Sequence, residues 1–278
     1  MAFNFEAAIK EAEKSSTENL VSAIVLGPSG AGKSSIMGTF GVKTLYLYTS
    51  GESHGPLAAR TLGGNNIIGV CIDQDNGATL GPDAAYARLL NILGDLDGIK
   101  KLGVKAVTLD GASEIEAIIR ATEKWKQLCL SANGKHNGFA EPAATISLLR
   151  PVLNLLRDLQ TRLGVHFAMS CILDVKDVGP DGAILEAVPR LVGYSVAEML
   201  IQQFADVLVV GRMTKNDVAK HKIQFMSDVN KVSKDQVGNV KKAINFAPRV
   251  AGVLVNQLPP IMDADLSQVI KLKQKDLQ

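Results

Sequence analysis

Short apolar runs alternate with amphipathic segments along most of this chain. Runs typical of buried strands occupy residues 20–26, 44–49, 67–72, 104–109, 165–173 and 205–210. Apolar residues at three- and four-residue spacing predict helices at 83–93, 146–163 and 194–204, and one long helix whose apolar face runs from 115 to 129. Alternating strands and helices predict an α/β fold, with a mostly parallel sheet covered by helices on both faces. Ligands bind such sheets at the carboxyl ends of the strands.

Three details refine this pattern. Trp125 falls on the apolar face of the long helix, so we expect it in the core rather than on a nucleic-acid stacking surface. Pro151 fits the 146–163 helix only if it lies in the first turn, because proline has no backbone N–H. Residues 131–141 are rich in Gly and Asn and predict a loop, and 179–182 (GPDG) predicts a turn.

Composition favours a well-buried, globular chain. Of the 278 residues, 46% are apolar and 21% are charged, which suits one α/β domain over 20–278 preceded by a short helical extension over 1–19. No run of eighteen apolar residues occurs, and 1–16 is too charged for a signal peptide, so we expect a cytoplasmic protein without a membrane partner. The three cysteines, Cys71, Cys129 and Cys171, are far apart in apolar settings, which predicts reduced thiols.

The first candidate site follows the first strand, where the chain matches the pattern G-x-x-x-x-G-K-[ST]. Glycines in such a loop let backbone N–H groups turn toward a phosphate, the lysine reaches the β- and γ-phosphates, and the hydroxyl ligates Mg²⁺. A chance match in a glycine-rich turn is the alternative, but strand, loop, lysine and hydroxyl coincide here. We therefore predict ATP and Mg²⁺ as ligands. The predicted cradle comprises Gly27, Pro28, Ser29, Gly30, Ala31, Gly32, Lys33, Ser34 and Ser35.

Two acidic residues follow later strands. Asp110 ends the 104–109 strand and is predicted to hold the metal opposite Ser34; its alternative role is an N-cap of the next helix. Glu52 follows the 44–49 strand and is chemically suited to activate a water for attack on the γ-phosphate. Taken alone, Glu52 could equally be an ordinary exposed loop glutamate.

Several segments resemble one family. TLYLYTSGES (44–53), VTLDGASEI (107–115) and PRLVGYSVAEMLIQQFADVLVV (189–210) are similar to RecA and RadA recombinases and other RecA-like P-loop ATPases, most of all to compact phage-encoded members of recombinase or single-strand annealing type. The resemblance implies that Lys33 and Glu52 are catalytic, that the protein forms homo-oligomers, and that it acts on single-stranded DNA. Where the family carries a γ-phosphate sensor, this chain has Ser170 and Cys171.

The resemblance also implies where partners bind. DNA contacts would come from the loops that contain Lys135, Lys176 and Arg190. A cation from a neighbouring subunit would complete the active site, and the residues in that region are Lys241, Lys242 and Arg249.

The distribution of charge along the chain does not decide which partner binds. Between 212 and 249 nine basic residues stand against three acidic ones, a local net charge of +6 that leaves −4 for the rest. This segment favours a polyanion or a neighbour's nucleotide, or it is a solvated surface. Two other functions stay open: a phage assembly or virion component that binds nucleotide together with other phage proteins, and a P-loop kinase. Against the kinase stands the lack of an arginine-rich lid.

Overall fold

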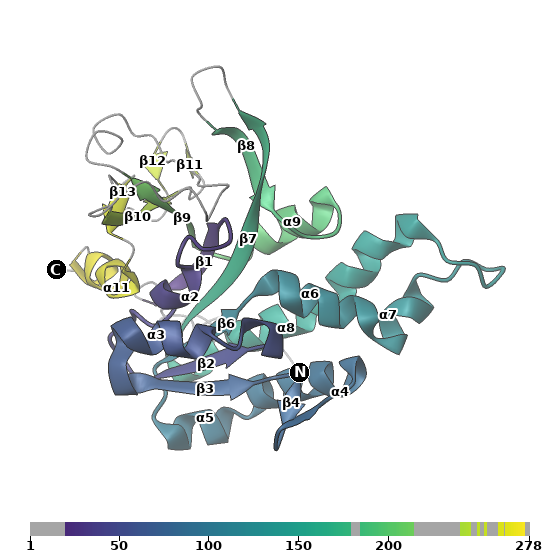
Figure 1. Cartoon of the computed structure of the whole chain (residues 1–278), viewed down its shortest axis with the longest axis horizontal. Coiled ribbons are helices and arrows are strands. Elements are labelled where there is room, and N and C mark those ends of the chain that lie inside the picture. The colour runs from purple at the N-terminus through teal and green to yellow at the C-terminus, as the bar shows by residue number, and fades with distance from the viewer. Residues whose placement is uncertain are drawn as a thin grey trace, which may run out of the picture.

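The computed structural model describes residues 20–178, 184–213, 240–245, 249–250, 253–254, 261–263 and 265–275. The predicted extension, 1–19, lies outside these ranges. Within them, six parallel strands form the middle of the main sheet in the order β9–β1–β7–β6–β2–β3 (Figure 1). Beyond β9 the antiparallel strands β10 and β13 extend the sheet. The predicted α/β class with a mostly parallel sheet is confirmed.

The elements have the following bounds. The strands of the main sheet are β1 (Ser22–Gly27), β2 (Thr44–Tyr48), β3 (Ile67–Cys71), β6 (Ala106–Asp110), β7 (His166–Val178), β8 (Ile184–Pro189), β9 (Asp206–Met213), β10 (Val240–Asn245) and β13 (Ile261–Asp263). Short pairs are β4 (Gln74–Asp75) with β5 (Ala78–Thr79), and β11 (Arg249–Val250) with β12 (Val253–Leu254). The α-helices are α2 (Lys33–Ile36), α3 (Gly55–Gly63), α4 (Pro82–Gly94), α5 (Leu96–Leu102), α6 (Ala112–Ala121), α7 (Glu123–Leu128), α8 (Glu141–Leu163), α9 (Tyr194–Ile201) and α11 (Leu266–Lys275).

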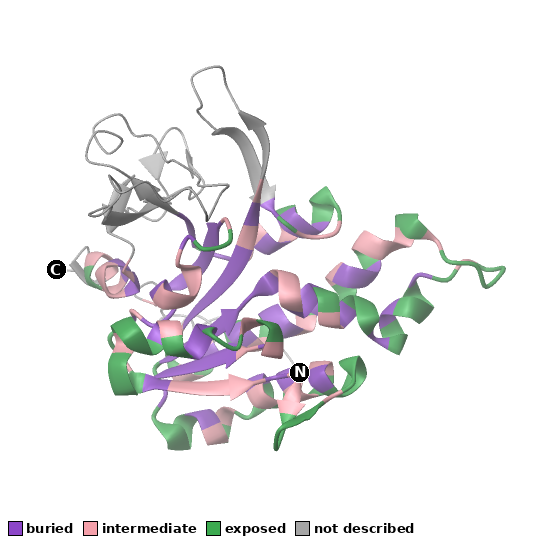
Figure 2. Cartoon of the chain, in the orientation of Figure 1, coloured by how far each residue is buried: buried purple, intermediate pink, exposed green. Residues whose placement is uncertain are grey.

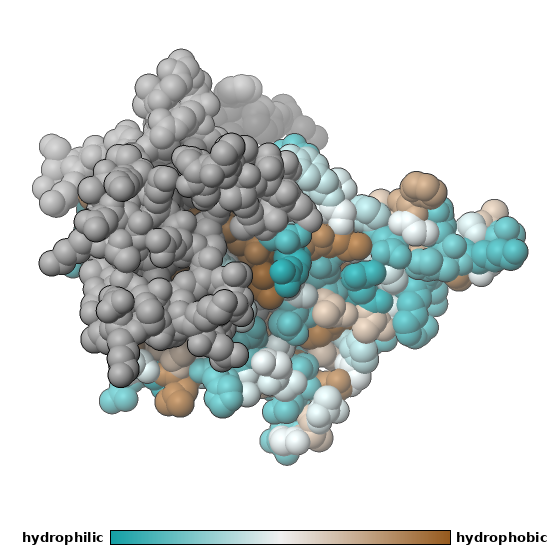
Figure 3. All heavy atoms as spheres, turned by 45° about the horizontal axis from the view of Figure 1, so that its top comes forward, coloured by the Kyte–Doolittle hydropathy of each residue, from teal (hydrophilic) through white to brown (hydrophobic). Residues whose placement is uncertain are grey.

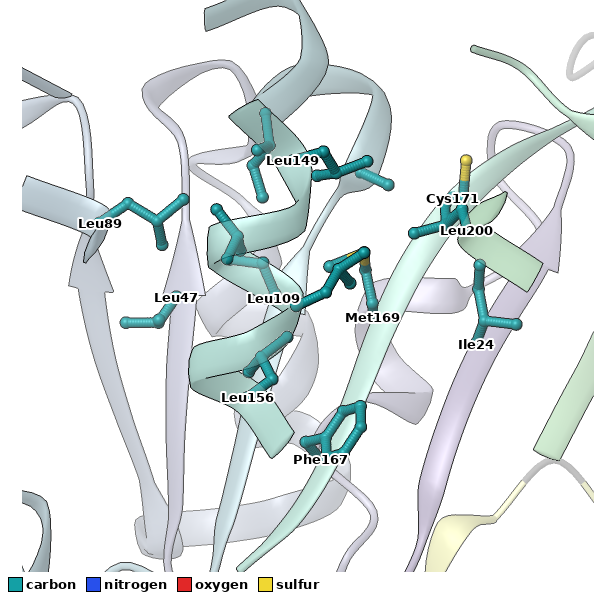
Figure 4. Close-up of a cluster of buried hydrophobic side chains, with 14 of the residues drawn as sticks. Ile24, Leu47, Leu89, Leu109, Leu149, Leu156, Phe167, Met169, Cys171 and Leu200 are labelled. Atoms are coloured by element: carbon teal, nitrogen blue, oxygen red, sulfur yellow. The ribbon is translucent and has the colours of Figure 1, made fainter. Parts of the chain in front are cut away.

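Helices bury both faces of the sheet. On one face, Ile24 and Leu26 pack in a cluster with residues of α4, α6, α8 and α9, part of which Figure 4 shows. On the other, Ala23 and Val25 pack with residues of α2, α3 and α11. A strand covered on both sides has to be apolar along most of its length, which explains the apolar run 23–26 and the buried central strands in Figure 2.

The long helix predicted around 115–129 is wrong, because the chain forms two helices there. α6 ends at Ala121 and α7 begins at Glu123. Thr122, between them, has extended backbone, and its hydroxyl accepts a hydrogen bond from Trp125 N. Such an N-cap starts a new helix. Trp125 is nevertheless in the core, as predicted, and its Nε1 donates to Thr145 Oγ1 at 2.9 Å.

The predicted position of Pro151 is also wrong. α8 begins at Glu141, not at 146, so Pro151 lies in the interior of a 23-residue helix, and Pro142 occupies the first turn. Pro151 has no N–H, so the carbonyl of Ser147 receives no helical hydrogen bond. Ser147 is exposed, and water can donate to this carbonyl instead. Among the described helices, α8 included, none is long and apolar enough to cross a bilayer.

The strand predicted at 165–173 is longer than expected. β7 continues to Val178 and pairs with β8 in an antiparallel hairpin that rises from the sheet (Figure 1). The predicted turn, Gly179 to Gly182, lies outside the described residues. Lys176 therefore lies on a strand rather than in a loop, and Arg190 directly follows β8.

Buried polar groups join β1 to its neighbours at the end opposite the phosphate loop. Lys273 of α11 forms an ion pair with the fully buried Asp206 at 2.7 Å. Val21 N donates to His166 Nδ1 at 3.0 Å, and Phe40 stacks on the imidazole ring. Burial, together with the charge of Lys273, lowers the pKa of His166 from 6.5 to about 4. The ring is therefore neutral in the folded protein at neutral pH.

We expect His166 to make the fold acid-sensitive. Between pH 6.5 and about 4 the unfolded chain protonates this residue and the folded chain does not, so the free energy of unfolding falls as pH falls, by about 3 kcal/mol at most. Urea unfolding at a series of pH values measures the slope. His166→Gln keeps a side-chain acceptor for Val21 N and should flatten this part of the curve relative to wild type. An identical slope in both proteins would show that the imidazole does not contribute.

Candidate functional site

The predicted phosphate loop leaves the sheet at its centre. β1 lies between β7 and β9 and ends at Gly27, and α2 begins at Lys33. Gly30 and Gly32 have φ angles of 76° and 92°, a region that favours glycine and that turns the loop back over the strand end. Lys33 Nζ donates to the carbonyl oxygens of Gly27 and Pro28, each at 3.0 Å. The ammonium group thus lies over the loop.

Six of the nine predicted cradle residues and both predicted acids line one cavity of about 310 Å³, whereas Gly27, Pro28 and Ala31 do not line it. Glu52 comes from the end of β2, Asp110 from the end of β6, and Lys33 from the loop after β1. Burial lowers the pKa of Lys33, while the charges of Asp110 and Glu52 oppose this shift. The predicted residues that line the cavity are Ser29, Gly30, Gly32, Lys33, Ser34, Ser35, Glu52 and Asp110.

Asp110 is held by hydroxyl groups of the two strands beside it. Only 3% of the residue is exposed. Tyr46 Oη, on β2, donates to Oδ2, and Ser170 Oγ, on β7, donates to Oδ1. Asp110 does not cap α6: Gly111 occupies the N-cap and no side chain accepts a cap hydrogen bond there. The alternative role of Asp110 as an N-cap is therefore wrong.

Glu52 lies in a short turn that is fastened to the next strand. Ser50–Glu52 form a 3₁₀ turn after β2, and Asp73, beyond β3, accepts hydrogen bonds from Ser50 N at 2.7 Å and Ser50 Oγ at 2.6 Å. Burial raises the pKa of Glu52, helped by the nearby carboxylates of Asp110 and Glu114 and opposed by Lys33. The carboxylate is therefore a stronger proton acceptor than an exposed glutamate.

The donor atoms in the cavity suit Mg²⁺. The Ser34 hydroxyl and the Asp110 carboxylate offer oxygen atoms in one cavity, and Mg²⁺ prefers one or two such protein ligands, completing its shell with phosphate oxygens and water. Over the described ranges no three His, Cys, Asp or Glu side chains converge on a common point. A cation here would thus take its remaining ligands from a bound nucleotide.

Comparison with known proteins adds little to this geometry. No protein-family model and no curated protein matches the sequence. Among solved structures, the ATPase DotB of Legionella pneumophila matches with a TM-score of 0.28 and 7% sequence identity. The match covers 95% of this chain and 54% of DotB, so the chain spans about half the length of that protein. So low a TM-score carries no argument, and the α/β class rests on the strand order itself.

Sequence reasoning missed several residues around the cavity. Tyr46 falls within the predicted strand 44–49 without a role of its own, although a buried tyrosine needs a partner for its hydroxyl. Ser170 donates its hydroxyl hydrogen to Asp110, a contact that the sequence does not predict. Glu114 lines the cavity from α6. Cys171 also lines it, and burial raises the pKa of its thiol to about 11, so the thiol is neutral near pH 7.

The predicted DNA-contacting residues are not brought together. Lys135 is exposed in the loop between α7 and α8, at the far end of the molecule from the phosphate loop (Figure 1). Arg190 does not line the cavity, but its carbonyl accepts a hydrogen bond at 3.1 Å from Ser113 Oγ, and Ser113 does line it. The backbone of Lys176 lies on β7, and its side chain is outside the described part of the structure.

Two of the predicted trans-acting cations lie on a strand of the main sheet, and the third lies on a short strand of a separate pair. Lys241 and Lys242 are in β10, paired with Arg212 and Gly211 of β9, and Arg249 is in β11. Their side chains are outside the described part of the structure, as is most of the basic segment 212–249. Their assignment to a neighbour's active site stays a prediction.

Cys71, Cys129 and Cys171 are all free thiols, as predicted.

Proposed function

We propose that this chain is a RecA-like ATPase that binds ATP with Mg²⁺ and hydrolyses it. The observation that carries the proposal is the single cavity in which Lys33, Asp110 and Glu52 meet, although they follow three different strands. A lysine, a metal-binding carboxylate and a second carboxylate are the groups that phosphoryl transfer to water requires. The carboxyl ends of parallel strands are also where α/β sheets bind their ligands.

Each group has a distinct part in the proposed reaction. Lys33 leaves its carbonyl partners and binds the β- and γ-phosphates, where its charge stabilises the transition state. Ser34 and Asp110 hold Mg²⁺, which neutralises charge on the phosphate oxygens when bound. Glu52 orients a water molecule and accepts its proton as the water oxygen bonds to the γ-phosphorus and the bond to the ADP oxygen breaks.

The partner that we propose is single-stranded DNA. The loop between α7 and α8 carries Lys135 and, at its end, Phe139, whose side chain is 99% exposed. An exposed cation and an exposed aromatic ring four residues apart suit a single strand, since the ring can stack on a base and the cation can pair with a phosphate. Hydrophilic residues cover most of this projecting part, with isolated apolar spots near its end (Figure 3).

Phosphate release from ATP, measured with and without single-stranded DNA, tests the proposal. We expect hydrolysis that EDTA abolishes and DNA stimulates. Lys135→Ala should lower the slope of log binding constant against log salt by about 0.7, one phosphate contact, and Phe139→Ala should weaken DNA binding by about 1–3 kcal/mol. Lys124→Ala, which removes an exposed lysine from α7, is the matched control.

Other results would point elsewhere. Hydrolysis without any response to DNA would favour an assembly component and contradict the DNA partner. Transfer of the γ-phosphate to a small acceptor, with no phosphate release in its absence, would favour a kinase and contradict hydrolysis.

A further inference from the structure

Tyr46 is a fully buried residue whose hydroxyl lies against Asp110, one of the residues that line the cavity. The residue is 0% exposed, and its ring packs on the α2 and α3 face of the sheet. Its Cα pairs with Thr108 of β6, two residues before Asp110, so the long side chain reaches along the sheet to the strand end. Residues two apart on a strand lie on the same face, which places Tyr46 and Asp110 together under the phosphate loop.

The Tyr46 hydroxyl lies between the two predicted metal ligands. It donates to Asp110 Oδ2, and the Ser34 side chain is near enough to the same hydroxyl to lower its pKa. Ser34 belongs to the start of α2 and Asp110 to the end of β6, so Tyr46 lies where the two elements meet. Each Asp110 oxygen carries more than one lone pair, and one hydroxyl on each leaves capacity for a metal or its water.

The backbone of α3 packs closely against this hydroxyl. A Cβ atom on Gly55, the first residue of α3, would lie 2.7 Å from Tyr46 Oη and 2.9 Å from Asp110 Oδ2. Cβ atoms essentially never come so close to another heavy atom, so any side chain at this position would push the hydroxyl or the carboxylate aside. The helix backbone therefore closes over the hydroxyl and the carboxylate and limits their movement.

We propose that Tyr46 is a positioning residue which, through its hydroxyl, sets Asp110 and Ser34 at the separation that Mg²⁺ of the bound nucleotide requires. The inference rests on the proposed function and adds a residue to it. Tyr46 touches neither the nucleotide nor the reacting atoms in this scheme. It acts through Asp110 and Ser34, in the way that outer hydrogen bonds orient metal ligands elsewhere.

This role needs the Tyr46 hydroxyl, because it is the hydroxyl that donates to Asp110. A simple packing role, in contrast, would need only the ring, which phenylalanine supplies equally well.

Tyr46→Phe separates these two roles because it removes one oxygen and keeps the ring. Binding of a fluorescent ATP analogue is measured in EDTA and then over a range of Mg²⁺ concentrations. We expect the affinity for the analogue in EDTA to stay within about twofold of wild type. The Mg²⁺ midpoint, which is the Mg²⁺ concentration that gives half of the full change in analogue affinity, should rise about 10- to 100-fold. Excess Mg²⁺ should then restore turnover. Tyr48→Phe removes the hydroxyl of the neighbouring tyrosine on β2 and should leave the Mg²⁺ midpoint unchanged.

Ser170→Ala is the second variant, since it removes the other hydroxyl from Asp110. A Mg²⁺ midpoint that rises in Ser170→Ala, but less than in Tyr46→Phe, supports the inference, because Ser170 holds Asp110 alone and not Ser34. An unchanged Mg²⁺ midpoint in a folded Tyr46→Phe protein, judged by its thermal unfolding, overturns it. Failure of the proposed function looks different: wild type would then bind no nucleotide, or would bind it with no effect of Mg²⁺.

Discussion

Lys33→Ala is expected to abolish measurable ATP binding, with a loss of affinity of roughly 100-fold or more. The substitution removes the only lysine that lines the described cavity, and hydrogen bonds from a charged group to phosphate are each worth about 1.5–3 kcal/mol. The loop backbone keeps its own restraints, among them the bond from Ala31 N to Pro28 O at 3.2 Å. Titration with a fluorescent ATP analogue measures the effect.

Lys43→Ala is the matched control for this variant. Lys43 is exposed just before β2, outside the cavity, and its loss should leave binding unchanged. Equal far-ultraviolet circular dichroism would establish that both variants fold. Wild-type affinity in folded Lys33→Ala would contradict the phosphate site and, with it, the proposed ATPase activity.

Glu52→Gln is expected to slow turnover by roughly 10²- to 10⁴-fold while ATP binding is retained. The amide keeps the shape of the side chain but cannot take a proton from water. Because burial raises the pKa of Glu52, wild-type turnover should fall with decreasing pH at a higher pH than an exposed glutamate would give. The variant should lack this acid limb. Single-turnover phosphate release over a pH series measures both effects.

Glu114→Gln tests which of the two glutamates that line the cavity is the general base. Glu114 lines the same space from α6 and raises the pKa of Glu52, so its neutralisation should shift the acid limb of turnover to lower pH with the rate at neutral pH largely kept. Loss of turnover in Glu114→Gln, together with normal turnover in Glu52→Gln, would assign the base to Glu114 and refute the role proposed for Glu52.

The parts of the site that could be predicted are those encoded locally. The phosphate loop is one continuous motif, and Asp110 and Glu52 each directly follow an apolar strand. Parallel strands bring their carboxyl ends to one edge, so the meeting of the three groups follows from the fold class. Neither the order of the strands nor the face on which each side chain lies is contained in such a motif.

The contacts of Tyr46 could not be predicted from the sequence. Its partner Asp110 is 64 residues away, and Ser170 is 60 residues beyond Asp110. Their contact depends on β6 lying between β2 and β7, which no single strand pattern specifies. The helix errors have a more local origin: Thr122 is compatible with a helix interior by size, and only its capping bond to Trp125 N reveals the break. Pro151 is tolerated because the carbonyl that it leaves unpaired belongs to an exposed residue.

The ion pair between Lys273 and Asp206 has a consequence for the order in which the protein folds during synthesis. α11 packs on β1 and α2, and Leu266 N binds Thr39 Oγ1, 227 residues earlier in the chain. β1 is the first of the described strands to be synthesised, and α11, which shares the second face of β1 with α2 and α3, is the last of the described helices. Contacts so distant in sequence form slowly. The part of this face that α11 covers therefore stays exposed until all the other described elements have been synthesised.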